Sequence, residues 1–405
     1  MSIGKSFRKA CKVLIVADCD YQDKPLGGVV SLLRNMLMVG CGDRVEFSLA
    51  GISFDPQEIA GVWQEKNIGN NIYHWMPVYV CRKAKEDTKF PIRFRLVGGV
   101  KRYLQSSVLN DFDAIYIHSV EVALALPRMD IPIICHVHSD PLLTIIRSRF
   151  PLLQSHFFVR QYDKIIQKVF DRSIGIIWAA DACRREYYRR LGVDRVSRWD
   201  NKSTVIHSSV DPVMLDELEK VQPSSRDKLK RIVTVSRLSE VKHIDFLIKV
   251  FSELKRKNPD IEFNIAGEGE CEAALRRQVE ELNCIDCVHF LGNLNKRQLA
   301  NLLSRMDVFV FASESEAMSL VILESMAAGV PVVSTNVGDI SQVVNSSTGA
   351  ILESRNIDSF IEAVEGCLAV EKTQYERACK SVAQAFTAER MRRSIEEFIV
   401  RGVSG

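Results

Sequence analysis

Short, continuously apolar segments recur along the whole chain, and they constrain its fold more than any other feature. Strands of a parallel sheet are buried on both faces, so their sequences are continuously apolar. Strands with one solvent-exposed face instead alternate apolar and polar residues. The first half of the chain has such runs at Val13–Ala17, Val45–Ala50, Ala114–His118, Ile131–Val137, Ile174–Ala179 and Thr204–His207. The second half has them at Ile232–Ser236, Glu262–Ala266, Val288–Leu291, Val308–Phe311 and Val330–Ser334.

Patterns with helical spacing separate most of these runs. They lie at Val29–Val39, His243–Lys257, Glu272–Asn283, Lys296–Ser304, Leu320–Ala328 and Ile357–Ala369. Alternating strands and helices predict an α/β fold with two Rossmann-like, doubly wound parallel-sheet domains that face a cleft. The polar segment Val221–Lys230 contains Pro-Ser-Ser and has the composition of a linker. We therefore expect a first domain over residues 1–220 and a second over residues 221–385.

Several classes of protein are excluded by composition. The chain has no apolar run of the roughly 18 residues that a membrane-spanning helix requires. Its start, Met1–Lys12, is basic and lacks the apolar core of a signal peptide. The 11 cysteines are scattered without a framework, which favours a reducing compartment and a cytoplasmic protein. Cys284 and Cys287 have the spacing of a zinc-binding pair, but only His289 lies nearby, so we interpret them as part of a turn.

The net charge of +3 is unevenly distributed. Residues 1–212 contain 30 Lys and Arg against 22 Asp and Glu, a balance of +8, whereas residues 213–405 contain 24 against 29, a balance of −5. The densest basic segment, Arg82–Arg102, has eight basic and two acidic residues with apolar ones between them. It reads either as a solvated surface or as a docking site for an anionic membrane. No nucleic-acid-binding motif accompanies the charge, so we expect no nucleic-acid partner.

Charged and glycine-containing segments follow the predicted strands of the second half. Arg237 and Lys242 follow one strand, Gly267 follows the next, and Glu316 precedes a helix that carries Glu324. Ligands of doubly wound sheets bind at the carboxyl ends of the strands. A helix N-terminus offers unpaired N–H groups to an anion, and two nearby cations suit a diphosphate. Any one of these charged residues, taken alone, is typical of a solvated surface. Taken together, they predict a nucleoside-diphosphate site.

These residues resemble the motifs of the retaining glycosyltransferases of family four, which have the GT-B fold. Glu316 and Glu324 match the E-x7-E motif of that family, and Arg237 and Lys242 match its Arg-x4-Lys motif. The run Ser325-Met-Ala-Ala-Gly-Val-Pro331 is similar to the segment that follows the second glutamate of the family. The similarity is continuous from about residue 204 to residue 368 and looser before it.

The resemblance implies a role for each matched position. Arg237 and Lys242 would hold the diphosphate, Glu324 the ribose and Glu316 the donor sugar. Backbone N–H groups before the helix would line the phosphates, and a Gly-Gly loop after the first strand would lie near them. The implied donor-binding residues are Gly27, Gly28, Arg237, Lys242, Gly267, Glu316, Met318, Ser319, Leu320 and Glu324. The implied catalytic residues are His138, which would lie close to the donor sugar, Glu316, Arg237 and Lys242.

One position departs from the pattern of the family. Family members usually have Gly-Phe-Gly after the first glutamate, whereas this chain has Ala317-Met318-Ser319. Side chains therefore stand where the backbone is usually bare, and we expect the choice of donor sugar to differ. Ser209-Val210-Asp211 resembles the segment that closes the first domain of the family. The resemblance implies that the first domain, residues 1–220, binds the acceptor and that the second, residues 221–385, binds the nucleotide sugar. In this fold the C-terminal helix, here residues 386–405, crosses back to the first domain.

Two further patterns suggest metal ligands. Asp18-Cys-Asp20 is a DxD sequence, and His136 and His138 are spaced for one face of a strand. The histidine pair has no obvious third ligand in the sequence, so we favour a single functional histidine, His138. There is no GxxxxGK loop, and no GxGxxG follows the first strand, so a nicotinamide cofactor is not expected. We expect neither a cofactor nor a metal.

The resemblance therefore implies a metal-independent hexosyltransferase that retains anomeric configuration. The donor would be a UDP- or GDP-sugar. The acceptor would be a hydroxyl of a glycan. The basic first half favours a lipid-linked oligosaccharide or lipopolysaccharide, reached from a peripheral position on the inner face of the cytoplasmic membrane, whereas incidental charge would leave a soluble acceptor open. Two alternatives remain open: a nucleotide-sugar epimerase of the same fold, which would turn over the donor alone, and a non-catalytic nucleotide-sugar-binding protein.

Overall fold

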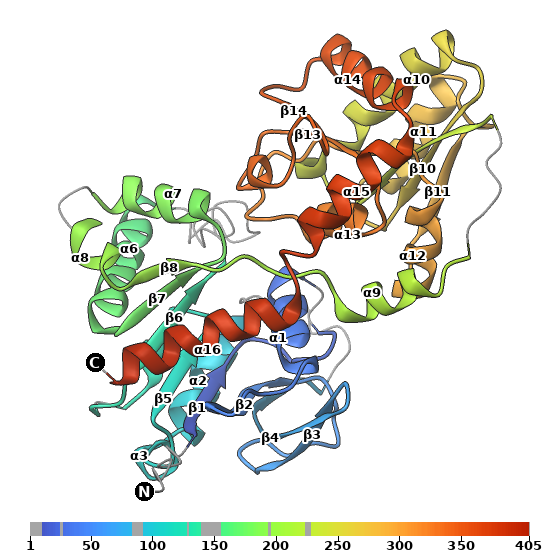
Figure 1. Cartoon of the computed structure of the whole chain (residues 1–405). Coiled ribbons are helices and arrows are strands. Elements are labelled where there is room, and N and C mark those ends of the chain that lie inside the picture. The colour runs from blue at the N-terminus through green and yellow to red at the C-terminus, as the bar shows by residue number, and fades with distance from the viewer. Residues whose placement is uncertain are drawn as a thin grey trace, which may run out of the picture. The chain divides into compact units, whose positions relative to one another are not determined.

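The computed structural model describes residues 10–24, 27–82, 92–127, 129–138, 155–192, 196–222 and 228–404. It divides into two compact domains, each with its own parallel sheet (Figure 1). The first domain comprises Met1–His207 together with Ala388–Gly405, and the second comprises Ser208–Thr387. The mixed α/β class with two Rossmann-like sheets is the one predicted from the sequence. Much of the basic segment between Arg82 and Ile92, and residues 223–227 of the expected linker, lie outside the described residues.

The first domain contains an eight-stranded sheet in the order β3-β4-β2-β1-β5-β6-β7-β8. Neighbouring strands are parallel except β3 and β4, which form an antiparallel pair at one edge. The strands are β1 (Cys11–Val16), β2 (Val45–Ser53), β3 (Gln64–Ile68), β4 (Asn71–Val80), β5 (Ala114–Ile117), β6 (Ile133–Val137), β7 (Gly175–Trp178) and β8 (Ser203–Val205). Central strands β1, β5 and β6 are almost wholly buried, as continuous apolar runs require.

Helices cover this sheet, and the last one comes from the C-terminal end of the chain. They are α1 (Gly28–Met38), α2 (Ile92–Tyr103), α3 (Ser106–Leu109), α4 (Val122–Ala125), α6 (His156–Arg172), α7 (Asp181–Leu191), α8 (Val196–Asp200) and α16 (Ala388–Ser404). Helix α16 lies beside α1, and its buried Met391, Ile395 and Ile399 join the core that contains Leu33 of α1 (Figure 1). The carboxylate of Glu396 accepts the backbone N–H of Gly42 at 2.8 Å.

The second domain contains a six-stranded parallel sheet in the order β11-β10-β9-β12-β13-β14. The strands are β9 (Lys230–Val235), β10 (Ile261–Ala266), β11 (Val288–Gly292), β12 (Val308–Phe311), β13 (Val332–Thr335) and β14 (Gly349–Leu352). The helices are α9 (Pro212–Glu219), α10 (Ile244–Lys257), α11 (Glu272–Glu281), α12 (Lys296–Ser304), α13 (Leu320–Ala327), α14 (Ile357–Ala369) and α15 (Lys372–Ala383), with 3-10 turns η3 (Glu240–Lys242) and η4 (Ile340–Gln342).

The boundary between the domains lies earlier than the sequence suggested. The division falls after His207 and not after residue 220, so α9 belongs to the second domain. Asp211 caps α9 by accepting the N–H of Val213 at 2.9 Å, and Pro212 occupies the first helical position. The buried side chain of Met214 then packs into the core of the second domain. The polar segment Val221–Lys230 therefore follows the end of α9 and does not mark the start of the second domain.

The pair Cys284 and Cys287 lies in a turn between α11 and β11, as the sequence predicted. Both thiols are buried in the core of the second domain, and the Sγ of Cys287 lies 3.4 Å from the backbone oxygen of Cys284. Within the described residues, the structure contains no helix that is both long enough and apolar enough to span a bilayer.

Candidate functional site

Lys242 and Glu316 form the centre of the candidate site in the second domain. Lys242 ends η3, which follows β9, and Glu316 lies in the loop after β12. The Lys242 Nζ donates to the Glu316 carboxylate, and the two side chains are 21% and 17% exposed. The ammonium also lies 5.6 Å from the centre of the Phe311 ring. The fold thus brings together two residues that the sequence analysis had assigned to one site.

Arg237 also follows β9, but it points to a different carboxylate. Its guanidinium lies 3.1 Å from Glu270, and the two side chains are 73% and 57% exposed. An ion pair this open to water contributes little to stability, so the guanidinium can readily exchange Glu270 for a ligand phosphate. The structure places Arg237 at the predicted strand end without joining it to Glu316.

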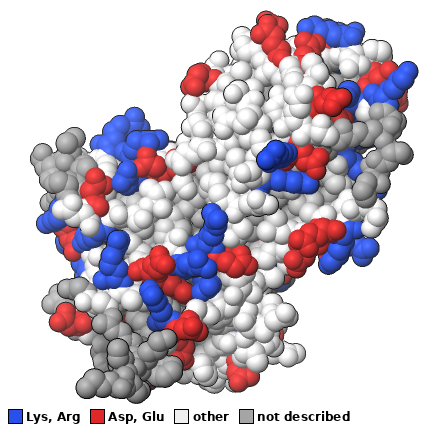
Figure 2. Space-filling view, in the orientation of Figure 1, with Lys and Arg blue, Asp and Glu red and all other residues white. Residues whose placement is uncertain are grey.

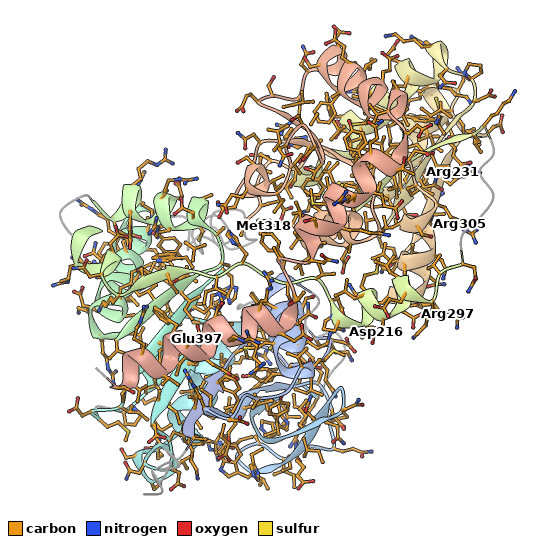
Figure 3. The ribbon with its side chains drawn as sticks, in the orientation of Figure 1. Asp216, Arg231, Arg297, Arg305, Met318 and Glu397 are labelled. Atoms are coloured by element: carbon orange, nitrogen blue, oxygen red, sulfur yellow. The ribbon has the colours of Figure 1, made fainter. Side chains whose placement is uncertain are left out.

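The start of helix α13 provides backbone donors at the same edge of the sheet. Leu320 is its first residue, Ser319 is the N-cap, and Met318 lies just before it (Figure 3). The Ser319 side chain makes no capping hydrogen bond. The N–H groups of a first helical turn lack intrahelical acceptors and carry the positive end of the helix dipole. These three predicted residues therefore lie at a helix terminus suited to an anion.

Two glycines let the loops of the site pack closely. Gly338 has φ +60°, and a Cβ there would lie 2.4 Å from the backbone oxygen of Glu316. Gly267 has φ +123°, and a Cβ there would lie 1.9 Å from the backbone oxygen of Ser236. Only glycine accepts both constraints. A glycine at position 267 is needed because the loop after β10 packs directly against the end of β9 there.

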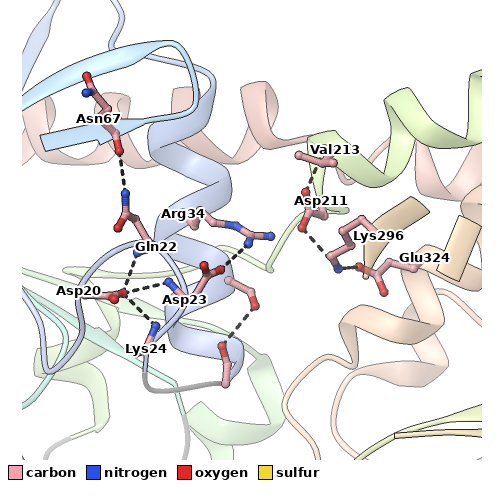
Figure 4. A network of polar contacts seen from close by, with 12 residues as sticks. Asp20, Gln22, Asp23, Lys24, Arg34, Asn67, Asp211, Val213, Lys296 and Glu324 are labelled. Carbon is pink, nitrogen blue, oxygen red and sulfur yellow. Dashed lines mark hydrogen bonds and ion pairs between the residues drawn. The ribbon is translucent and has the colours of Figure 1, made fainter. Parts of the chain in front are cut away.

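Glu324 is buried on α13 and held by a residue that sequence reasoning missed. The Lys296 Nζ donates to the Glu324 carboxylate and lies 3.4 Å from Asp211 (Figure 4). Both carboxylate side chains are 3% exposed. Burial acts to lower the pKa of Lys296, but the attraction of Glu324 and Asp211 outweighs it and the pKa is raised. Lys296 is therefore a charged bridge between the start of α9 and α13.

The N-terminal cap of helix α12 positions Lys296 for this bridge. Asn295 and Gln298 form a capping box at the start of α12, with both reciprocal hydrogen bonds present. That box fixes Lys296 as the first residue of the helix. The sequence signal was available as Asn295-x-x-Gln298, but it identifies only a helix start and does not reveal which carboxylates lie opposite.

Gly27 and Gly28 stand at the start of α1 in the first domain. Gly27 is the N-cap residue, and its backbone oxygen accepts the N–H of Ser31 at 3.1 Å. A Cβ at either glycine would meet no atom within 4 Å, so neither is required by packing among the described residues. That these glycines lie close to a bound phosphate stays a prediction.

His138 follows β6 and is hydrogen-bonded to a second histidine. Its Nε2 lies 2.7 Å from the Nδ1 of His118, at the end of β5. Next to them, the Nδ1 of His136 lies 2.5 Å from the hydroxyl of Tyr116. Burial lowers the pKa of His138 to about 3 and lowers the pKa values of His118 and His136 well below the ordinary value. All three imidazoles are therefore neutral near pH 7.

The three histidines are close enough to suggest a metal site, but their rings are poorly arranged for one. A ring nitrogen from each lies within 4.8 Å of the others, so His118 is the third candidate ligand that sequence reasoning missed. The ring centroids of His136 and His138 are 4.2 Å apart, and their ring planes differ by 23°. The ring planes of His118 and His138 differ by 17°. Imidazole lone pairs lie in the ring plane, so stacked rings do not converge on one ion. That no metal is required stays a prediction.

The second aspartate of the DxD sequence serves the structure of a loop. One carboxylate oxygen of Asp20 accepts the backbone N–H groups of Gln22, Asp23 and Lys24, each at 2.9 Å (Figure 4). Asp18 lies apart from this turn, in a cavity beside the histidines. The two carboxylates therefore have different surroundings.

Known proteins match the second domain in sequence and the whole chain in fold. Residues 216–384 match the family described as glycosyl transferases group 1. One component of the phosphatidylinositol N-acetylglucosaminyltransferase of Homo sapiens is 33% identical over 178 residues, which cover 42% of this chain and 37% of that protein. The chain thus spans about two fifths of the length of the curated relatives it matches.

Two solved structures show the fold. Sucrose-phosphate synthase from Thermosynechococcus elongatus has a TM-score of 0.72 at 15% identity, covering 96% of this chain and 98% of that one. Alr3699/HepE of Anabaena, in complex with UDP and glucose, has a TM-score of 0.65 at 16% identity, covering 96% and 100%. The chain therefore has the GT-B fold, and residues 216–384 of its second domain match the glycosyl transferases of group 1, in agreement with the family-four motifs of the sequence.

Proposed function

We propose that the protein is a retaining, metal-independent hexosyltransferase that uses a UDP- or GDP-sugar. The observation that carries the proposal is the pairing of Lys242 with Glu316 beside the start of α13. It combines a cation, a carboxylate and backbone donors at one sheet edge, which suits a sugar diphosphate. The relatives support it, because one is named as an N-acetylglucosaminyltransferase and one solved structure contains UDP and glucose.

In this proposal the second domain stabilises the leaving group. Departure of the nucleoside diphosphate leaves an oxocarbenium-like sugar, and negative charge builds up on the phosphates. Lys242, Arg237 and the N–H groups at the start of α13 would face that charge. A bound diphosphate would pair with the Lys242 ammonium in place of Glu316. The Glu316 carboxylate would then accept hydrogen bonds from hydroxyls of the sugar. Glu324, which Lys296 already orients, would accept hydrogen bonds from the ribose hydroxyls.

Retention in a single displacement requires that the acceptor enters on the face from which the diphosphate leaves, whereas a double displacement would need a carboxylate nucleophile. We assign deprotonation of the acceptor hydroxyl to an oxygen of the departing phosphate, so that no carboxylate nucleophile is needed. The family resemblance assigns His138 to the donor sugar, and a neutral imidazole suits that role because it both donates and accepts hydrogen bonds.

We propose a glycan hydroxyl as the acceptor, on a lipid-linked oligosaccharide or lipopolysaccharide at an anionic cytoplasmic membrane face. The relative named for phosphatidylinositol supports a lipid-linked acceptor. The basic balance of residues 1–212 supports membrane contact, and the described part of the basic segment places Arg95, Lys101 and Arg102 on α2. Among the described residues on the face seen in Figure 2, however, Lys and Arg side chains are mixed with Asp and Glu and form no continuous basic patch.

The direct test follows the fate of a labelled donor by NMR. With a UDP- or GDP-hexose and an acceptor glycan, the account predicts a new glycosidic product with the anomeric configuration of the donor. Change of the hexose in the donor alone would identify an epimerase. Binding of donor without any product, over a panel of acceptors, would indicate a non-catalytic binding protein.

A further inference from the structure

His243, which directly follows Lys242, has a backbone conformation that is unusual for a residue with a side chain. Its φ of 48° and ψ of 45° lie in the left-handed region. In the described part of the chain it is one of three non-glycine residues with a positive φ. Glycine enters this region without the clash that a Cβ brings, and other residues held there cluster at functional sites. The turn alone would favour glycine, so the imidazole needs a separate reason.

The helix that begins after His243 does not supply that reason. His243 is the N-cap of α10, but its side chain makes no capping hydrogen bond. The side chain is 26% exposed, yet its Nε2 atom is buried and has no hydrogen-bond partner among the described residues. Buried polar atoms are rarely left unpaired. The Oε2 of Glu314 lies 3.6 Å from this nitrogen, just beyond the length of a hydrogen bond.

Glu314 belongs to the loop after β12, and backbone contacts already join this loop to the turn η3. The backbone oxygen of Val241 accepts the N–H of Glu314 at 2.9 Å. The same loop carries Glu316, whose carboxylate accepts from Lys242. Two side-chain pairs thus lie between the same two segments. The pair of Lys242 and Glu316 is formed, whereas the pair of His243 and Glu314 needs a closing movement of about 0.7 Å to reach a usual N–H···O length.

Binding of a donor would remove the first of these pairs. In the proposed function, which this step assumes, the diphosphate competes with Glu316 for the Lys242 ammonium. The two segments would then lose one connection, although Glu316 has to stay in place to reach the donor sugar. An imidazole with a proton on Nε2 donates to a carboxylate whether the ring is neutral or charged. His243 and Glu314 can therefore supply the replacement connection.

We infer that His243 is a positioning residue of the donor site. When a nucleoside diphosphate pairs with Lys242, the Nε2–H of His243 donates to the Glu314 carboxylate and holds the loop of Glu316 against η3. His243 acts through Glu314 and does not itself contact the donor.

A double-mutant cycle on nucleotide affinity tests this inference. Titration calorimetry with UDP and with GDP compares the unmodified full chain with His243→Asn, Glu314→Gln and the double variant. Asparagine tolerates the left-handed region, so His243→Asn keeps the turn and removes the imidazole. We expect each single variant to bind nucleotide about fivefold more weakly, the effect of one hydrogen bond. The double variant should bind no more weakly than either single variant, because all three lack the same bond.

The same domain offers a matched control. The Nε2 of His289 lies 3.7 Å from the Oε2 of Glu262, so this pair has nearly the same spacing, but it joins β11 to β10. His289→Asn should leave nucleotide affinity unchanged. His243→Gly suits the left-handed turn even better than asparagine, so it separates the imidazole from the backbone. We expect it to bind nucleotide as weakly as His243→Asn.

Long-range ¹H–¹⁵N NMR spectra of the imidazoles give a second readout, which a merely structural role would not change. Addition of nucleotide should shift the Nε2 signal of His243 in the unmodified chain, and this shift should be absent in Glu314→Gln. The spectrum should be recorded with whichever of UDP and GDP binds more tightly.

Four results would overturn the inference: unchanged affinity in both single variants, effects that multiply to about 25-fold in the double variant, unmodified affinity in His243→Gly, or a His243 signal that nucleotide does not move. Any of these in a chain that binds nucleotide refutes this inference alone. A chain that binds neither UDP nor GDP refutes the proposed donor site, and the inference with it.

Discussion

Lys242 and Glu316 are 74 residues apart in the chain, yet their side chains form a mostly buried ion pair. The pair joins the loop after β9 to the loop after β12. A diphosphate carries more negative charge than the Glu316 carboxylate, so in the proposed donor site it would compete with Glu316 for the ammonium. The pair is thus a resting arrangement of the proposed donor site.

Lys242→Met should weaken UDP or GDP binding by tenfold or more, because one charge-assisted contact to phosphate contributes about 1.5–3 kcal/mol. Titration calorimetry would measure the dissociation constant. Lys249→Met, at an exposed position on α10, removes the same charge elsewhere in the domain and should leave the affinity unchanged. Equal effects of the two variants would contradict a phosphate contact at Lys242.

Lys296→Met should lower the free energy of unfolding by about 2 kcal/mol, because it leaves Asp211 and Glu324 buried without their shared cation. The value is below the roughly 3–5 kcal/mol of a fully buried pair because Lys296 is 31% exposed. Urea unfolding would measure it. Lys380→Met, which breaks a surface pair with Glu376, is the control and should cost under about 1 kcal/mol. A loss no larger than that of the control would show that Lys296 is not a bridge.

Gly338→Ala should destabilise the loop around Glu316, because alanine resists φ +60° and its Cβ would meet backbone oxygens. We expect a loss of about 1–2 kcal/mol in unfolding free energy and weaker nucleotide binding. Gly98→Ala on α2 meets no atom within 4 Å and should stabilise the chain by about 0.5–1 kcal/mol. Thermal unfolding with and without UDP distinguishes the two, and tolerance of Gly338→Ala would refute the close packing.

Stability should fall as the pH is lowered below about 6.5. The histidine cluster is neutral when folded, with the pKa of His138 lowered to about 3, whereas unfolded histidines titrate near 6.5. Between these values the unfolded chain binds more protons, so unfolding is favoured by acid, by up to about 1.4 kcal/mol per pH unit for each buried histidine. His136→Phe should reduce this slope between pH 6.5 and 5, and His74→Gln should not. Equal slopes in urea unfolding would contradict a neutral, buried His136.

The sequence predicted most of the parallel strands and the charged residues at their ends, because both are local features. Continuous apolar runs identify strands buried on both faces, and Lys242 and Glu316 follow two of these runs. Strand β3 was missed because its sequence, Gln-Glu-Lys-Asn-Ile, has four polar residues and forms no apolar run. Strand β4 was missed as well, because polar residues and a proline interrupt its apolar positions. Strand β14, at one edge of the second sheet, is a short apolar run, Gly-Ala-Ile-Leu, that was overlooked.

The partners of site residues were harder to predict, because they depend on which elements become neighbours. His118 lies opposite His138 only because β5 and β6 pair in the sheet. That pairing was accessible in principle, since consecutive strands are often adjacent. Lys296 reaches Asp211 and Glu324 because α9, α12 and α13 pack together, which no local pattern specifies.

The most direct test of the central claim is thermal stabilisation of the chain by UDP, GDP and ADP in EDTA. A ligand at 100 times its dissociation constant adds about 2.7 kcal/mol to the stability of the folded state, which is a clear shift in Tm. The account predicts such a shift with UDP or GDP, without added metal, and its loss in Lys242→Met but not in Lys249→Met. A shift with none of the nucleotides, or one that Lys242→Met leaves intact, would contradict the proposed donor site.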